Sequence, residues 1–251
     1  MLWWREDFCR RLAARGRFVI RYDQRDSGLS TKYPPGRPGY GFEDAVDDAF
    51  RVLDGYRIAA AHVAGFSQGG MVGQGAVLKH PERVLSLTAI STSPIGVDWS
   101  SLPESGKAWL EHMAIDPDWS DRTEAVAYLV EDARLVAGTA YPFDKAATRA
   151  FIERDFDRSG GYLSATNHSV LFRIGKAWQE RLHEIKAPLL VIHGTADPIF
   201  PVGHGAVLAE AVAGAKLVKL EGGGHELHPG HWDRIVDAIA EHTGSKRAVD
   251  R

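Results

Sequence analysis

The chain has 251 residues, with 30 Lys and Arg side chains against 33 Asp and Glu, so its formal net charge is −3. A hydrophobic share of 44% and a charged share of 25% are typical of globular proteins and exclude a wholly disordered chain. The near-neutral balance provides no basic surface for nucleic acid, and the single cysteine, Cys9, excludes a disulfide-built secreted scaffold.

The apolar segments are too short for a membrane span, which needs about 20 consecutive apolar residues. The first apolar residues are followed directly by the charged residues Arg5, Glu6 and Asp7, whereas a signal peptide needs an uninterrupted apolar stretch after a basic start. We therefore expect no membrane partner and a cytoplasmic location.

The spacing of apolar residues predicts helices and strands in chain order. The elements expected first are a helix over 4–15, a strand at 18–23, a Gly- and Pro-rich loop over 26–41, a helix with apolar positions from Phe42 to Leu53 that Gly55 stops, a strand at Ala61–Phe66, a helix at Gln68–Lys79 and a strand at Val84–Ile90. Those expected last are strands at 188–193 and 215–220 and helices at 205–213 and 231–242. About five strands that alternate with helices predict an α/β fold with a mostly parallel sheet, covered on both faces.

A segment of about 90 residues interrupts this alternation with helical pattern and no convincing strand. Helix-capping signals recur within it, such as Asp121 followed by Glu124, and Asp144 before a periodic run. We expect a helical cap inserted into one core. The expected parts are residues 1–94 as the first part of the core, 95–185 as the cap and 186–251 as the second part, with a frayed polar tail at 243–251.

The most informative motif is a Gly-x-Ser-x-Gly sequence, Gly65 to Gly69, between a predicted strand and a predicted helix. A sharp strand-to-helix turn strains its central residue and crowds the positions two before and two after, so glycine at both is expected to expose the Ser67 hydroxyl. The N–H of Gln68, at the start of the helix, is then placed to donate to an oxyanion. The alternative is an ordinary tight turn with an exposed serine.

A nucleophilic serine needs a base and an orienting acid, and both should follow later strands of the sheet. Asp197 lies in the loop after the strand at 188–193, and His225 lies in the loop after the strand at 215–220. The order Ser67, Asp197, His225 is the order that this serine turn predicts.

Three other side chains compete for these roles or lie beside them. His228 is the nearest rival base, but it lies beyond the glycine turn, and Asp98, which follows the strand at Val84–Ile90, is the rival acid. We expect Asp98 on the surface or at a cap hinge, and His193 as a hydrogen-bonded histidine beside the acid loop. Among the other histidines, His80, His112 and His168 do not pair with another His or Glu at metal-ligand spacing, so we expect no metal.

These motifs resemble the α/β-hydrolase family, which has the same serine turn, an acid loop of the form His-Gly-x-x-Asp and a Gly-rich turn into the histidine. Residues 23–30, Asp-Gln-Arg-Asp-Ser-Gly-Leu-Ser, are similar to the turn after the family's fourth strand. Asp26 stands where many members have glycine, as in the aclacinomycin methylesterase-like branch. The resemblance covers most of the chain and implies that residues 95–185 cover the active site.

The resemblance also implies strands that this sequence does not contain. Family members place two or three strands before the helix expected at 4–15, and the third lies between the strands that correspond to 18–23 and Ala61–Phe66. Each buried backbone group left unpaired there costs about 1–3 kcal/mol. We expect either a start codon assigned too late, or a true truncation that closes up or pairs with another chain. With one oxyanion donor, Gln68, we expect weak activity.

Together these features predict a cofactor-free serine hydrolase that acts on small-molecule carboxylic esters. Amide or N-terminal-proline peptide hydrolysis on the same residues remains open, since acidic residues of the cap could bind a free amine; the candidates are Asp116, Asp118, Glu131 and Asp132. A non-catalytic remnant that binds a ligand through its cap is the alternative outside enzymes. The sequence predicts no oligomeric state.

Overall fold

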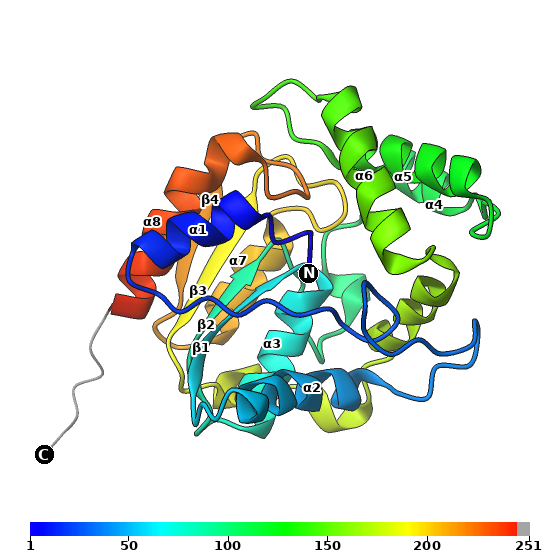
Figure 1. The fold of residues 1–251 in the computed structure, drawn as a ribbon. Coiled ribbons are helices and arrows are strands. Elements are labelled where there is room, and N and C mark those ends of the chain that lie inside the picture. Colours follow the sequence, from blue (N-terminus) through cyan, green and yellow to red (C-terminus); the bar gives the residue numbers. More distant parts are fainter. Residues whose placement is uncertain (245–251) are drawn as a thin grey trace, which may run out of the picture.

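A four-stranded parallel sheet forms the centre of the computed structural model, which describes residues 1–244 (Figure 1). The strands lie in the order β1-β2-β3-β4 and are β1 (Ala61–Phe66), β2 (Val84–Ile90), β3 (Leu189–Gly194) and β4 (Lys216–Leu220). Each neighbouring pair is parallel, and β2 and β3 are almost wholly buried because helices cover both faces of the sheet. The predicted α/β class is confirmed.

Helices cover both faces of this sheet. On one face lie α1 (Glu6–Ala14) and α8 (Trp232–Gly244), which pack side by side in Figure 1 and bury Phe8, Leu12 and Ile235 against the strands. On the other face lie α2 (Phe42–Gly55), α3 (Gln68–Lys79) and α7 (Gly203–Ala211). None of the helices within residues 1–244 combines the length and apolar character that a membrane span requires.

The segment between β2 and β3 is helical, as expected, and within it the structure places no strand. Its elements are the 3₁₀ turn η1 (Trp99–Ser101), α4 (Lys107–Met113), α5 (Arg122–Val136), α6 (Lys145–Ser159), and the 3₁₀ segments η2 (Leu163–Phe172), η3 (Lys176–Trp178) and η4 (Leu182–Glu184). The side chains of Asp121 and Asp144 accept the backbone N–H of Glu124 and Ala147, both at 2.9 Å, and so cap α5 and α6. The division into a core at 1–94 and 186–251 and a cap at 95–185 stays a prediction.

One predicted strand is missing from the sheet. Residues 18–23 are extended but pair with no strand, so the described chain has four paired strands where about five were expected (Figure 1). The apolar sequence favours extended backbone here, but strand structure also needs a neighbour to hydrogen-bond with. Phe18 consequently remains 76% exposed. Of the tail expected to fray, Thr243 and Gly244 belong to α8, and 245–251 lie outside the described residues.

Candidate active site

Ser67 lies at the turn between β1 and α3, where the sequence motif predicted it. Its backbone has φ 53° and ψ −122°, a strained conformation for a residue with a side chain. Two contacts with the end of β2 hold the turn, since Ser67 N–H donates to Ile90 O at 2.8 Å and the Thr92 hydroxyl donates to Ser67 O at 2.7 Å. The strained turn is therefore fixed by the neighbouring strand.

The two glycines of the motif are not equivalent. A Cβ at Gly65 would lie 2.1 Å from Gly69 O, so Gly65 has no room for a side chain. A Cβ at Gly69 would meet no heavy atom within 4 Å. The expectation that both positions are crowded is therefore wrong for Gly69, because it is the backbone of Gly69 that approaches the Cβ position of Gly65 and not the reverse.

The structure brings the three predicted residues into one hydrogen-bonded series. Ser67 Oγ lies 2.8 Å from His225 Nε2, and His225 Nδ1 lies 2.8 Å from Asp197 Oδ2. His225 is 8% exposed and Asp197 is 4% exposed, so water has little access to the bond between them. The rings of Phe66 and Phe200 lie 4.9 and 5.6 Å from the His225 ring, measured between centroids. Apolar groups thus surround the imidazole.

The loop after β3 fixes the other oxygen of Asp197. Oδ1 accepts the backbone N–H groups of Ile199 and Phe200, both at 2.9 Å. His193, at the end of β3, donates its Nε2–H to Phe200 O at 2.7 Å, and burial lowers its pKa, so the ring is held neutral. Its Nδ1 has no hydrogen-bond partner among the described residues. Oδ2 of Asp197 faces His225, and His193 Nε2 lies 3.5 Å from the same oxygen.

The helical segment between β2 and β3 holds the backbone around His225. The N–H of His225 donates to Val136 O at 2.8 Å, at the end of α5. In the other direction, Thr139 N–H donates to Gly222 O at 2.7 Å, and Gly138 N–H donates to the Glu226 carboxylate at 2.9 Å. The position of the imidazole therefore depends on the segment that follows α5.

Gln68 is the first residue of α3, and within the described chain no hydrogen bond from its backbone N–H is found. A free N–H at the start of a helix favours negative charge nearby. The Gln68 side chain points elsewhere, because its amide donates to His168 O at 3.1 Å, and His168 Nε2 donates to Arg25 O at 2.6 Å. These bonds link the turn to the loop that follows residues 18–23.

A cavity of about 1270 Å³ opens onto Ser67 and His225. The helical segment lines it with apolar groups that include the aromatic side chains of Trp119, Phe143, Phe151 and Tyr162. Of the four acidic residues considered for amine binding, Asp132 lines this cavity, whereas Asp116, Asp118 and Glu131 do not. Burial raises the pKa of the Asp132 carboxyl, which accepts the Trp109 indole N–H at 3.2 Å.

Neither rival residue joins the series. Asp98 caps the 3₁₀ turn η1 by accepting the Ser100 N–H at 3.0 Å. His228 accepts the Gly230 N–H at 3.1 Å, and its ring stacks on Tyr141 with centroids 4.5 Å apart. Each side chain is engaged away from Ser67.

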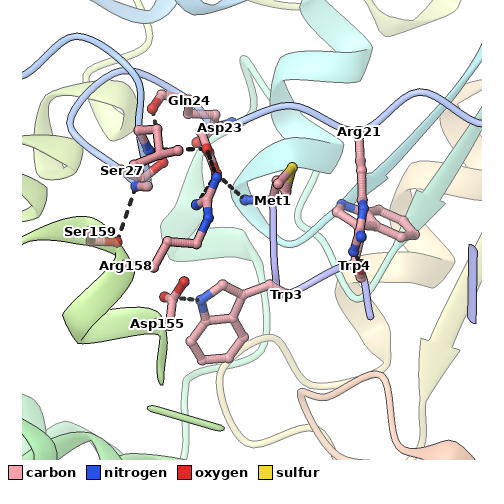
Figure 2. A network of polar contacts seen from close by, with 12 residues as sticks. Met1, Trp3, Trp4, Arg21, Asp23, Gln24, Ser27, Asp155, Arg158 and Ser159 are labelled. Carbon is pink, nitrogen blue, oxygen red and sulfur yellow. Dashed lines mark hydrogen bonds and ion pairs between the residues drawn. The ribbon is translucent and has the colours of Figure 1, made fainter. Parts of the chain in front are cut away.

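A polar network beside the cavity was not anticipated from the sequence (Figure 2). Arg158 of α6 donates to both oxygens of Asp23, at 3.1 and 2.6 Å, and the Met1 amino group lies 2.6 Å from Oδ1 (Figure 2). Burial opposes ionisation of Asp23, but these hydrogen bonds together hold its pKa well below the usual range. The Trp3 indole donates to Asp155 at 3.1 Å. The network ties α6 to the start of the chain.

Comparison with known proteins identifies the family. A family model described as the alpha/beta hydrolase fold matches residues 2–231. Two curated relatives are the rhodomycin D methylesterase DauP of Streptomyces sp. strain C5, 33% identical, and DnrP of Streptomyces peucetius, 32% identical; each match covers 96% of this chain and 86% of the relative. The bromoperoxidase from Bacillus anthracis shares the fold with a TM-score of 0.74 at 20% identity, over 95% of this chain and 86% of that one. The methylesterase branch that Asp26 indicated is confirmed by these relatives, and the chain belongs to the α/β-hydrolase family.

Proposed function

We propose that this chain hydrolyses carboxylic esters through an acyl-enzyme formed on Ser67. The observation that carries the proposal is the hydrogen-bonded series Ser67–His225–Asp197, with 2.8 Å at each step. A serine hydroxyl is a poor nucleophile at neutral pH, and a neutral imidazole within hydrogen-bonding distance is the group that activates it. Folding alone does not require these three side chains to meet.

In the first half-reaction the Ser67 oxygen attacks the ester carbonyl carbon while His225 Nε2 takes the hydroxyl proton. Asp197 accepts the Nδ1–H of His225, which keeps the imidazole in the tautomer with Nε2 free and stabilises the imidazolium that forms. The Gln68 N–H, at the start of α3, donates to the oxyanion. His225 then returns the proton to the leaving alcohol as the carbon–oxygen bond breaks.

In the second half-reaction water replaces the alcohol. His225 removes a proton from the water, the hydroxide attacks the acyl carbon, and the proton passes to Ser67 as the carboxylic acid leaves. Each residue returns to its starting state, so the cycle needs no cofactor. Among residues 1–244 no cluster of His, Cys, Asp and Glu could hold a metal ion.

The cavity and the relatives together favour methyl esters of bulky apolar acids. The names of DauP and DnrP describe methylesterases of rhodomycin D. In this chain the side chains that α5 and α6 contribute to the cavity, such as Leu129, Val136, Phe151 and Ile152, provide an apolar surface that suits a large acyl group. A methyl leaving group needs no further pocket beside Ser67.

Replacing Ser67 tests this proposal. We expect Ser67→Ala to abolish turnover of a short-chain nitrophenyl ester, with an unchanged circular dichroism spectrum, because the acyl-enzyme cannot form. The exposed Ser100 provides the control, and Ser100→Ala should retain the rate of the unaltered chain. Turnover that survives in Ser67→Ala would contradict the mechanism.

The two neighbouring histidines offer a sharper comparison. We expect His225→Ala to lower kcat by about 10³-fold or more, because within residues 1–244 His225 is the one base that hydrogen-bonds to the Ser67 hydroxyl. His228→Ala should retain most of the activity, since His228 stacks on Tyr141 and contacts neither Ser67 nor Asp197. Steady-state kinetics of both variants on the same ester measures the difference. Equal losses would contradict the assignment of the base.

A further inference from the structure

The face of α5 that lines the cavity is apolar except at one position. Leu129, Asp132, Ala133 and Val136 all line the cavity, and steps of three, four and seven residues from Leu129 place them on one side of the helix. Three of these four side chains are apolar, so Asp132 puts a carboxyl group into an otherwise apolar stripe. A carboxyl group in such a position is unusual, because Asp is ordinarily found on solvated surfaces.

The Asp132 carboxylate is only partly satisfied by the protein. Its Oδ1 accepts the indole N–H of Trp109, on the neighbouring helix α4, at 3.2 Å (Figure 1). Within residues 1–244 the other oxygen, Oδ2, has no hydrogen-bond partner, and no Lys or Arg side chain forms an ion pair with this carboxylate. Burial raises the pKa of the carboxyl group, which shows that its negative charge is poorly compensated. The side chain is nevertheless 27% exposed, so a ligand in the cavity can reach it.

A second polar group beside Asp132 also has no partner. His112, on α4, is 7% exposed, and its Nε2 is buried without a hydrogen-bond partner in the described part of the chain. This nitrogen lies 4.0 Å from Asp132 Oδ1, which is too far for a hydrogen bond. Tyr128, one turn before Asp132 on α5, stacks on the imidazole with ring centroids 4.1 Å apart. Because buried polar atoms are almost always hydrogen-bonded, these two unmet groups together indicate a site for a polar group of a ligand.

The carboxylate lies close to the reactive residues. Val136, one helical turn after Asp132, accepts the backbone N–H of His225 at 2.8 Å. One turn of an α-helix rises by about 5.4 Å. Positive charge on His225 accordingly lowers the pKa of the Asp132 carboxyl group, against the larger effect of burial. A molecule whose ester group contacts Ser67 can therefore reach Asp132 with another part of its acyl group.

These surroundings select an ammonium group as the partner. Oδ2 requires a hydrogen-bond donor and the carboxylate requires a positive charge, and an ammonium group supplies both. A hydroxyl group would satisfy the oxygen but would leave the charge uncompensated. Aromatic rings, which attract cations, lie near this part of the cavity, since Trp119 lines it and packs edge-on against Tyr128 with centroids 5.3 Å apart.

We propose that Asp132 binds an ammonium group of the substrate and thereby determines which esters the chain hydrolyses well. The amine site is argued from the contacts of Asp132, whereas the place of the amine on an ester rests on the proposed function. The preferred substrate is then an ester of a bulky, mostly apolar acid that carries one amine. Because the ammonium group and Asp132 form a neutral pair, the bound cation does not oppose the positive charge that develops on His225.

Two ligands of equal length measure the amine site without any catalysis. Octylammonium carries the charge, and octanol has a hydroxyl group in its place. Asp132→Asn removes the negative charge but keeps an oxygen that can accept the Trp109 N–H, so a purely structural role in packing α4 against α5 would be retained. We expect this variant to lower the ratio of octylammonium affinity to octanol affinity by about tenfold or more, measured by isothermal titration calorimetry.

Glu131→Gln is the matched control for this measurement. Glu131 is the next residue on α5, does not line the cavity and forms an exposed ion pair with Arg134, so its variant removes the same charge and should keep the affinity ratio. An unchanged ratio in Asp132→Asn, or equal losses in the two variants, would overturn the proposal. The unaltered chain provides a test that does not depend on the folding of a variant, because octylammonium binding that is no tighter than octanol binding would also overturn it.

Ester hydrolysis tests the substrate class and separates this proposal from the proposed function. The nitrophenyl ester of ω-aminooctanoic acid is compared with that of nonanoic acid, in which a methyl group replaces the ammonium group. We expect kcat/KM to favour the amino ester, mainly through KM, and Asp132→Asn to reduce this preference by about tenfold. Asp132-dependent binding of octylammonium without turnover of either ester supports the amine site and contradicts the esterase. Turnover with the same ester preference in Asp132→Asn and the unaltered chain supports the esterase and overturns the amine site.

Discussion

Gly65 is the residue where the active-site turn is least tolerant of change. We expect Gly65→Ala to lower the free energy of unfolding by about 1–3 kcal/mol, because its Cβ would lie 2.1 Å from the backbone oxygen of Gly69. The same substitution at Gly69 provides the matched control, since a Cβ there meets nothing within 4 Å. Urea unfolding of the two variants measures the difference. Equal destabilisation would show that the turn is not held by this close approach.

The residues of the series could be found from sequence because their signals are local. Ser67 is marked by the glycine motif around it, and Asp197 and His225 each follow a strand within a few residues. Parallel strands then bring their carboxyl ends to one edge. The unequal roles of Gly65 and Gly69 could not be found in this way, because they depend on which backbone atom approaches which Cβ.

At the scale of elements, the ion pair between Asp23 and Arg158 joins the extended segment to α6. We expect Asp23→Asn to cost about 1–3 kcal/mol, because the side chain is largely buried and Arg158 loses the partner to which it makes two hydrogen bonds. The control is Asp157, which lies next to Arg158 on α6 and forms an exposed ion pair with Arg122. Asp157→Asn should cause no measurable loss. Similar urea midpoints for the two variants would contradict this account of how α6 is held.

The elements themselves were mostly predictable, and their contacts were not. Periodicity located α3, β1 and β2 with the bounds that the structure gives, and it located α2 from the correct first residue, Phe42. The prediction of a strand at 18–23 was wrong because an apolar sequence pattern indicates only burial, whereas a strand also needs a neighbouring strand to hydrogen-bond with. The Asp23–Arg158 pair, 135 residues apart, leaves no local signal at either position.

At the scale of the whole molecule, buried histidines should make the fold sensitive to acid. Burial lowers the pKa of His193, His204 and His242 below the ordinary value of about 6.5. At pH values below about 6.5 the unfolded chain therefore binds more protons than the folded chain. The free energy of unfolding is highest above pH 6.5 and decreases as the pH falls toward 5.

His242 allows this pH dependence to be tested. Its Nε2–H donates to Leu87 O at 3.2 Å, and the amide of His242→Gln can keep a donor there without titrating. We expect the variant to lose stability less steeply between pH 7 and pH 5, by up to about 1.4 kcal/mol per pH unit. Urea unfolding at three pH values measures the slope. An unchanged slope would show that His242 does not contribute to the acid sensitivity.

The central claim is that Ser67 is a nucleophile activated by His225. The most direct measurement is the mass of the intact protein after reaction with a fluorophosphonate probe, followed by peptide mapping of the adduct. The account predicts one adduct, on Ser67, and its loss in the His225→Ala variant. A folded chain that stays unlabelled, or that is labelled equally without His225, would contradict it.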